Sequence, residues 1–217
     1  MFKSSQVMQL FPVFVWAQVL EDDVAGPLNE HLRQQVSLLK PVDADPDAPY
    51  SGWQTRKDLH TLPEFGQMND IIHASARKVL EFLNVVPTPM DITGCWMNVK
   101  PRGAGHTLHG HPNNYLSGVY YVTAPEGADN ILFHDFRMER HIIVPRFAEQ
   151  TPANESLSRV PIKEGVLIMF PSWLAHSVQA NPTDEERISL AFNVMFSDFT
   201  GTLAQPNWSP DSGNAST

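Results

Sequence analysis

The pattern of apolar and polar positions divides the chain into a helical first part and a strand-rich second part. Residues 7–19 alternate loosely and are rich in Val, Phe and Trp, which predicts one or two strands around Pro12. Residues 22–39, which open with two capping aspartates, and residues 66–83 carry apolar positions at helical spacing. From Ile92 onwards, short apolar runs are broken by Gly, Pro and Asn, a pattern typical of a β-barrel or jelly roll.

This order of elements predicts a mainly β fold with flanking helices. We expect a double-stranded β-helix, or jelly roll, with the two N-terminal helices buttressing the outside of one sheet. A chain of 217 residues fits one domain. Within it we expect a support of helices and strand over 1–90, a jelly-roll core over 91–199 and a polar tail over 200–217.

Composition narrows the class of protein. Hydrophobic residues make up 42% and charged residues 18%, so the chain is expected to fold. The net charge of −9 argues against nucleic-acid binding, which needs a basic surface. The single cysteine, Cys95, excludes an internal disulfide and suits a reducing cytoplasm. No run of about 18 apolar residues and no signal-peptide pattern occurs, so we expect a cytoplasmic protein without membrane contact.

Three histidines and an arginine carry the candidate chemistry. His109 and His111 stand at i and i+2, so on an extended strand both side chains project from one face. His176 follows an apolar strand over 165–170 and a short turn, and Arg187 opens another strand. The His-x-His pair alone is weak, because nine histidines in this chain give about 0.4 such pairs by chance.

The order of four sequence blocks is more specific. His109 to Pro112, Ser117 to Tyr121, Phe170 to His176 and Glu186 to Ser189 resemble successive blocks of a family of 2-oxoglutarate/Fe(II) oxygenases from bacteria and phages. That family is similar to the prolyl-hydroxylase-like branch of the superfamily. The resemblance covers nearly the whole chain from about Leu10 and is specific for fold and cofactor, but it says almost nothing about the substrate.

The resemblance implies Fe(II) as the metal and 2-oxoglutarate and O2 as co-substrates, with ascorbate as a candidate reductant. His109, His111 and His176 would be the metal ligands, and no catalytic residue is implied beyond them. Arg187 suits the distal carboxylate of 2-oxoglutarate, because a guanidinium forms a two-pronged ion pair. We expect Arg187 to lie on the strand that returns beside the one carrying His176.

Three further residues are candidates for the co-substrate site. Ser189 shares the strand face of Arg187, whereas the residues between and beyond them, Ile188, Leu190 and Phe192, are expected to pack in the core. The resemblance suggests that Tyr121 points inward, although a core aromatic explains it equally well. Asn98, two residues after Trp96 on the preceding strand, is a weaker candidate.

His111 departs from the usual pattern, because most of the superfamily carries Asp or Glu at this position. A neutral imidazole there leaves one more positive charge at the metal and admits Zn or Ni as well as iron. Asp135 is an alternative ligand that would supply the missing carboxylate. His106 stands at i−3 from His109 and is expected to leave the inward face of the strand.

The leading functional hypothesis is hydroxylation of an unactivated C–H bond in a protein side chain or a small metabolite, with decarboxylation of 2-oxoglutarate to succinate. One alternative is a cupin-like three-histidine dioxygenase or isomerase that does not use 2-oxoglutarate. Another is a β-barrel module that binds a small acid or a metal. We expect residues 41–61 and 137–158 to form lids that select the substrate, and the apolar N-terminal stretch is a candidate homodimer interface.

Overall fold

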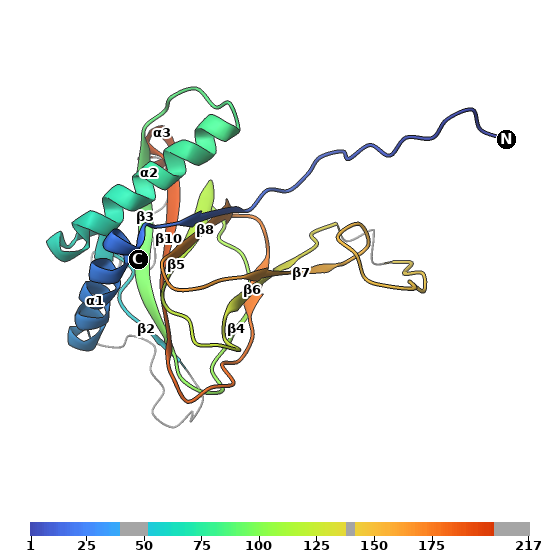
Figure 1. The fold of residues 1–217 in the computed structure, drawn as a ribbon. Helices are drawn as coiled ribbons and strands as arrows, with labels where there is room; N and C mark the ends of the chain where they lie inside the picture. The colour runs from blue at the N-terminus through green and yellow to red at the C-terminus, as the bar shows by residue number, and fades with distance from the viewer. Residues whose placement is uncertain (40–51, 138–141, 202–217) are drawn as a thin grey trace, which may run out of the picture.

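Two antiparallel β-sheets lie face to face, with helices on the outer side of one of them (Figure 1). The computed structural model describes residues 1–39, 52–137 and 142–201. The larger sheet has the strand order β1-β8-β5-β10-β3-β2 and the smaller one β4-β9-β6-β7. This is the mainly β jelly roll with flanking helices that the sequence predicts.

The strands and helices are bounded as follows: β1 Trp16–Val19, α1 Asp22–Leu38, β2 Trp53–Gln54, α2 Gly66–Phe82, β3 Met90–Lys100, β4 His106–His109, β5 Leu116–Thr123, β6 Asn130–His134, β7 Leu157–Pro161, β8 Val166–Pro171, β9 His176–Val178, β10 Arg187–Phe196 and α3 Ser197–Thr200. Two 3-10 turns, Leu59–Thr61 and Pro63–Phe65, lead into α2. Among the described residues, no helix is long and apolar enough to cross a membrane.

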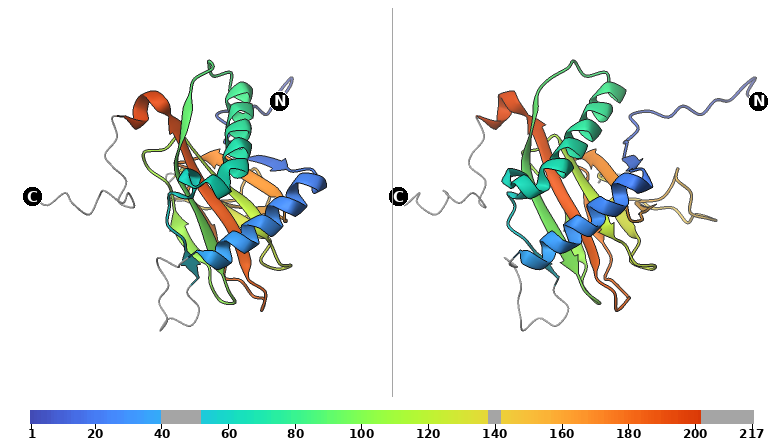
Figure 2. Two further views of the ribbon diagram at one scale, coloured as in Figure 1. Left: turned by 90° about the vertical axis from the view of Figure 1, so that its left-hand side faces the viewer. Right: turned by 60° about the vertical axis from the view of Figure 1, so that its left-hand side comes forward.

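Helices α1 and α2 cover the outer face of the six-stranded sheet, as Figure 2 shows. Leu28 and Leu32 of α1 and Ile72 of α2 belong to one buried cluster with residues of β3, β5, β8 and β10. The expected capping by the two aspartates is wrong. The cap position is Glu21, whose side chain makes no capping hydrogen bond, and Asp22 and Asp23 lie in the first helical turn, where their charge complements the helix dipole.

Strand β10 lies between β3 and β5 and pairs with both. Its side chains alternate between the two faces of the sheet. Those that face the helices lie in the buried cluster, namely Ile188, Leu190, Phe192 and Val194. The opposite side chains, Arg187, Ser189 and Ala191, face the four-stranded sheet and line a cavity there. The prediction that alternate side chains of this strand face the core and the candidate site is confirmed.

The N-terminal segment forms less strand than the alternation predicts. Only Trp16–Val19 pairs, as an edge strand against residues 166–169 of β8. Residues 1–12 extend away from the body of the protein (Figure 1), so of the one or two strands expected around Pro12 only one forms, and it begins after Pro12. β8 continues to Pro171 without pairing with residues before Trp16, which leaves the alternating residues 7–15 with no sheet to join.

A second apolar cluster lies between the two sheets and forms the floor of the cavity. Phe133 of β6 and Phe170 of β8 meet edge to face, with ring centroids 5.0 Å apart. The other buried members of this cluster are Tyr121, Ile131, Ile162, Val166, Ile168 and Leu174. The two clusters together enclose the strands that carry the candidate site.

We expect Gly118→Ala to destabilise the protein, because β5 passes tightly over Phe192 at this point. A Cβ at Gly118 would lie 2.3 Å from Cζ of Phe192 and 2.9 Å from the carbonyl oxygen of Ile168. Overpacking of this kind costs about 1–3 kcal/mol in the free energy of unfolding. Gly66→Ala is the matched control, since a Cβ at Gly66 meets nothing within 4 Å. Denaturant unfolding of both variants tests this, and equal stability of Gly118→Ala and wild type would contradict it.

Candidate active site

Three imidazole rings converge at one end of the space between the sheets. His109 at the end of β4 is the direct cross-strand partner of His176 at the start of β9. His111 follows two residues later. The ring centroids lie 4.3 Å apart for His109 and His176, 5.1 Å for His109 and His111, and 5.2 Å for His111 and His176. One ring nitrogen of each lies within 4.8 Å of the others, a spacing that fits a shared metal ion.

The local backbone differs from the expected extended strand. β4 ends at His109, so His111 lies beyond the strand, and its backbone N–H donates to the carbonyl of Ser172 at 2.9 Å. The pairing of β4 with β9 also shifts register between His106 and His109. Such an irregularity changes the direction in which the side chains project from the strand. His106 therefore lines the cavity and stacks on His109, with ring centroids 4.2 Å apart. The expectation that His106 would leave the inward face of the strand is wrong.

Backbone carbonyls orient two of the three rings. Nδ1 of His109 lies 2.8 Å from the carbonyl oxygen of Thr107, and Nδ1 of His176 lies 3.0 Å from that of Leu174. A carbonyl only accepts hydrogen bonds, so each Nδ1 is the donor and each Nε2 keeps its lone pair. Metal-binding histidines show this arrangement, in which the second ring nitrogen is held by an acceptor.

The protonation state of the cluster also suits a metal. Burial, reinforced by the neighbouring imidazoles, lowers the pKa of His111 to about 3. Burial lowers the pKa of His176 to about 4. Both rings are therefore neutral near pH 7, and a neutral imidazole is the form that binds a metal.

A buried polar chain ties the turn behind His111 to the larger sheet. Ser117 on β5 donates its hydroxyl to Oδ1 of Asn193 on β10 at 2.8 Å. The hydroxyl of Ser172 lies 2.8 Å from that of Ser117, and the carbonyl of Ser172 accepts the N–H of His111. The position of His111 thus depends on three polar residues that sequence analysis missed.

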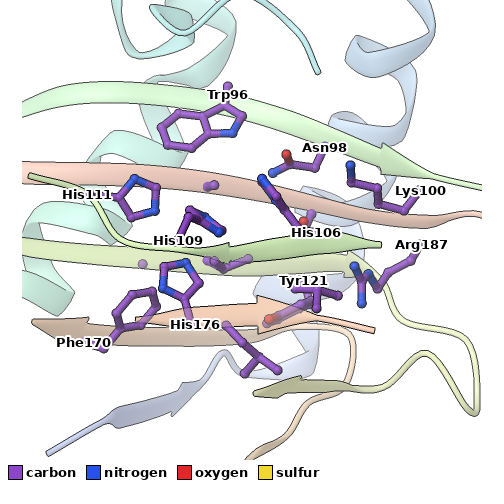
Figure 3. A pocket seen from close by; sticks show the side chains of 16 residues that line it. Trp96, Asn98, Lys100, His106, His109, His111, Tyr121, Phe170, His176 and Arg187 are labelled. Atoms are coloured by element: carbon purple, nitrogen blue, oxygen red, sulfur yellow. The ribbon is translucent and has the colours of Figure 1, made fainter. Parts of the chain in front are cut away.

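The residues predicted for the co-substrate line the same cavity. Arg187 and Ser189 come from β10, Asn98 from β3 and Tyr121 from β5. Figure 3 shows the histidines toward one end of the cavity and Arg187 at the other. Gln54 donates Nε2 to Oδ1 of Asn98 at 2.8 Å, which leaves the amide Nδ2 of Asn98 as a donor for a ligand.

Arg187 is a buried cation without a counter-ion among the described residues. Only 4% of its surface is exposed, its Nε has no hydrogen-bond partner, and Nη1 makes one long contact of 3.5 Å to the carbonyl of Ala128. Burial lowers its pKa. A buried charge is costly unless it is paired, so this end of the cavity fits an anionic group.

Two expectations about neighbouring residues need correction. β9, which carries His176, belongs to the four-stranded sheet, whereas Arg187 opens β10 in the six-stranded sheet, so the two strands are not neighbours. The chain crosses between sheets after β9, as a jelly roll requires. The carboxylate of Asp135 does not join the three histidines. It is held by Arg137, whose Nε donates to Oδ1 at 2.8 Å and Nη2 to Oδ2 at 3.0 Å.

The mouth of the cavity adds residues that were not predicted. Gln54, Lys57 and Trp96 line a hollow beside His111, with the ammonium of Lys57 5.6 Å from the centroid of the Trp96 ring. Gln54 and Lys57 belong to the expected lid 41–61, of which residues 41–51 lie outside the described structure, as do residues 138–141 of the second lid. Lys100 was also missed, although the period of two through Trp96 and Asn98 leads directly to it.

The central part of the chain is similar in sequence to a known protein family. Residues 94–193 match the sequence model of a family described as "Putative 2OG-Fe(II) oxygenase". This segment runs from within β3 to within β10 and includes the three histidines and Arg187. A search of curated protein sequences finds no match.

Solved structures share the fold at low sequence identity. HygX from Streptomyces hygroscopicus, crystallised with nickel, 2-oxoglutarate and hygromycin B, is 14% identical with a TM-score of 0.61, over 85% of this chain and 84% of HygX. The α-ketoglutarate-dependent epimerase SnoN of nogalamycin biosynthesis is 16% identical with a TM-score of 0.61, over 85% and 79%. A prolyl-4-hydroxylase of Pseudomonas putida is 16% identical with a TM-score of 0.57, over 85% and 93%.

The buried neutral state of His176 predicts a loss of stability in acid. His176 is 3% exposed, and its folded pKa of about 4 lies below the value of about 6.5 for an unfolded chain. Below pH 6.5 the unfolded chain therefore binds a proton that the folded one does not. At pH 5.5 this lowers the free energy of unfolding of the metal-free protein by about 1.4 kcal/mol relative to pH 8. Denaturant unfolding at pH 8 and pH 5.5 measures this effect in wild type and in His176→Gln. The free energy of unfolding should change less with pH in the variant, and an equal change in both proteins would contradict the prediction.

The family match spans the strands that carry the site, and the solved structures supply the same jelly-roll fold. The donor set, a cluster of three imidazoles facing a buried guanidinium across one cavity, agrees with both. Residues 94–193, just under half of the chain, thus resemble the 2OG-Fe(II) oxygenase family in sequence, and the solved structures show the same fold.

Proposed function

We propose that this protein is a 2OG-Fe(II) oxygenase that hydroxylates an unactivated C–H bond of a protein side chain or a small metabolite. One observation carries the proposal. A single cavity holds three imidazole nitrogens within 4.8 Å of one another toward one end, and at the other the guanidinium of Arg187, which has no counter-ion in the part of the chain that the structure describes. HygX, which has the same fold and binds nickel and 2-oxoglutarate, and the Pseudomonas putida prolyl-4-hydroxylase support it.

In this proposal His109, His111 and His176 hold the iron. His109 and His176 bind through Nε2, since their Nδ1 atoms donate to backbone carbonyls. When bound, Fe(II) and 2-oxoglutarate supply the oxidising chemistry, in which 2-oxoglutarate and O2 are consumed and succinate and CO2 are formed. All three ligands are imidazoles and none is a carboxylate, so the protein adds no negative charge to the metal.

The other end of the cavity would bind the distal carboxylate of 2-oxoglutarate. Arg187 offers two parallel N–H groups to its oxygens. The hydroxyl of Ser189 lies on the same strand face, and Tyr121 and Asn98 line the cavity between this end and the histidines. These residues orient the co-substrate, while the apolar wall around Phe170 keeps water out.

The remaining features of the proposal concern the whole chain. We propose that it works as one domain in the cytoplasm, where its single thiol, Cys95, is buried and protected. The acidic net charge of −9 supports a role without nucleic acid. Exposed apolar side chains in the extended segment 1–12 support a homodimer interface there.

Anaerobic titration with Fe(II) and 2-oxoglutarate tests the proposed cofactors. We expect a visible metal-to-ligand charge-transfer band that requires both additions, because 2-oxoglutarate must reach the metal. A band that forms without 2-oxoglutarate would favour a three-histidine dioxygenase or isomerase instead. Absence of metal binding would leave a small-acid binding module and would overturn the proposal.

His176→Ala should abolish iron binding while the protein stays folded. The ring packs against Phe170 at the cavity wall, with ring centroids 4.7 Å apart, so its loss removes a ligand and uncovers one edge of the second apolar cluster but takes away none of its members. Iron content after anaerobic loading and desalting measures the first part, and circular dichroism measures the second. His134→Ala is a matched control, because His134 hydrogen-bonds Ser177 at 2.8 Å and is not one of the three clustered rings. Normal iron content in folded His176→Ala protein would reject the ligand assignment.

Arg187→Ala should weaken 2-oxoglutarate binding and leave metal binding intact. Truncation leaves the distal carboxylate buried and unpaired at a cost of roughly 2–5 kcal/mol, which corresponds to about 30-fold or more in affinity. Arg187→Lys should recover only part of the lost affinity for 2-oxoglutarate, because an ammonium cannot reproduce the bidentate geometry of a guanidinium. Titration of the iron-loaded variants under anaerobic conditions measures the affinity. Unchanged 2-oxoglutarate affinity together with lost metal would refute the role of Arg187.

A further inference from the structure

Lys100 is a second buried cation at the Arg187 end of the cavity. The two residues are direct cross-strand partners in the pairing of β3 with β10. They are 8% and 4% exposed, and both line the cavity. Figure 3 shows the two side chains reaching into the same region, on the side away from His111.

This juxtaposition is unfavourable in the protein alone. Like charges directly opposite each other on a sheet are destabilising. Burial and the charge of Arg187 both lower the pKa of Lys100. Within the described ranges no carboxylate pairs with either cation, and the residues that line the cavity include no Asp or Glu. An anionic ligand in the cavity would supply a counter-charge to both cations.

The surrounding chain holds Lys100 in the interior. Gly52 lies against its side chain, and a Cβ at Gly52 would be 2.4 Å from Cδ and 3.1 Å from Nζ of Lys100. The space that a side chain would fill at Gly52 is thus occupied by the lysine stem. A surface lysine normally extends its ammonium to water, whereas this one is packed beneath a glycine and borders the cavity.

We propose that Lys100 and Arg187 form a two-cation site for the distal carboxylate of 2-oxoglutarate, so that the cavity selects 2-oxo acids with a second carboxylate. The inference rests on the proposed function. A carboxylate has about four lone-pair sites, enough for the guanidinium fork and an ammonium together.

The spacing along β3 agrees with this placement. The residues that face the cavity form successive cross-strand pairs: Lys100 with Arg187, Asn98 with Ser189, and Trp96 with Ala191. The ring of Trp96 lies 5.9 Å from that of His111, at the metal end. Lys100 is four residues further on, about 13 Å along the strand. Side chains that reach inward from both ends leave a gap suited to a short dicarboxylate.

Calorimetric titration of the Ni(II)-loaded protein tests the site without turnover. The ligands are 2-oxoglutarate and 2-oxopentanoate, which has the same carbon chain without the distal carboxylate. Lys100→Met should weaken 2-oxoglutarate binding at least tenfold, by about the strength of one charge-assisted hydrogen bond. It should leave the affinity for 2-oxopentanoate unchanged. Lys78→Met, at an exposed position of α2, is the matched control and should alter neither.

The stability of the metal-free protein gives an independent readout. Removing one of two facing cations should raise the thermal midpoint of Lys100→Met by about 2 °C or more, while Lys78→Met should stay at the wild-type value. A lysine with a purely structural role would lower the midpoint when replaced, and that result would overturn the inference.

The binding outcomes separate this inference from the proposed function. If wild-type Ni(II) protein does not bind 2-oxoglutarate, the proposed function fails and the two-cation site fails with it. If wild type binds it and Lys100→Met binds it equally well, the proposed function stands and the role of Lys100 is wrong. If Lys100→Met loses affinity equally for 2-oxoglutarate and 2-oxopentanoate, the cavity is distorted, and that result would also reject the two-cation site.

Discussion

The alternation of side chains along β10 is the constraint on which the rest of the structure depends. This strand lies between β3 and β5, and one of its faces packs against the helices while the other faces the opposite sheet. A shift of one residue would exchange Arg187 and Ser189 with Ile188 and Leu190. The apolar face therefore stabilises the register that also directs the guanidinium into the cavity. The same strand pairing thus stabilises the fold and positions the residues of the proposed co-substrate site.

The electrostatics of the cavity follow from its composition. His176 is buried, the other cavity histidines are half-buried, and the pKa values of His111 and His176 are lowered. Two cations lie at the far end, and the described residues of the wall include no acid. With His111 in place of a carboxylate, a bound divalent metal would keep its full charge. An acidic protein with a net charge of −9 thus encloses a cationic interior. Such a site disfavours neutral occupants and attracts small anions.

Backbone contacts, as well as side-chain identity, position the metal end. His111 lies outside any strand, yet the carbonyl of Ser172 holds it in place. That turn is linked through Ser117 to Asn193 on β10. The bulge in β4 turns His106 toward the cavity. Polar chains and bulges of this kind leave no periodic signal, because each contact joins residues more than fifty positions apart in the sequence or depends on a local shift of register.

The sequence by itself determined the succession of helices and strands, the order of the four motif blocks and the faces of β10, since these follow from local periodicity and spacing. It could not decide that Asp135 pairs with Arg137, that β9 and β10 lie in opposite sheets, or that Lys100 faces Arg187. Those relations depend on which strands become neighbours. Tertiary packing alone makes that choice, because burial of apolar area on both faces of the larger sheet selects one strand order from many that the same local pattern permits.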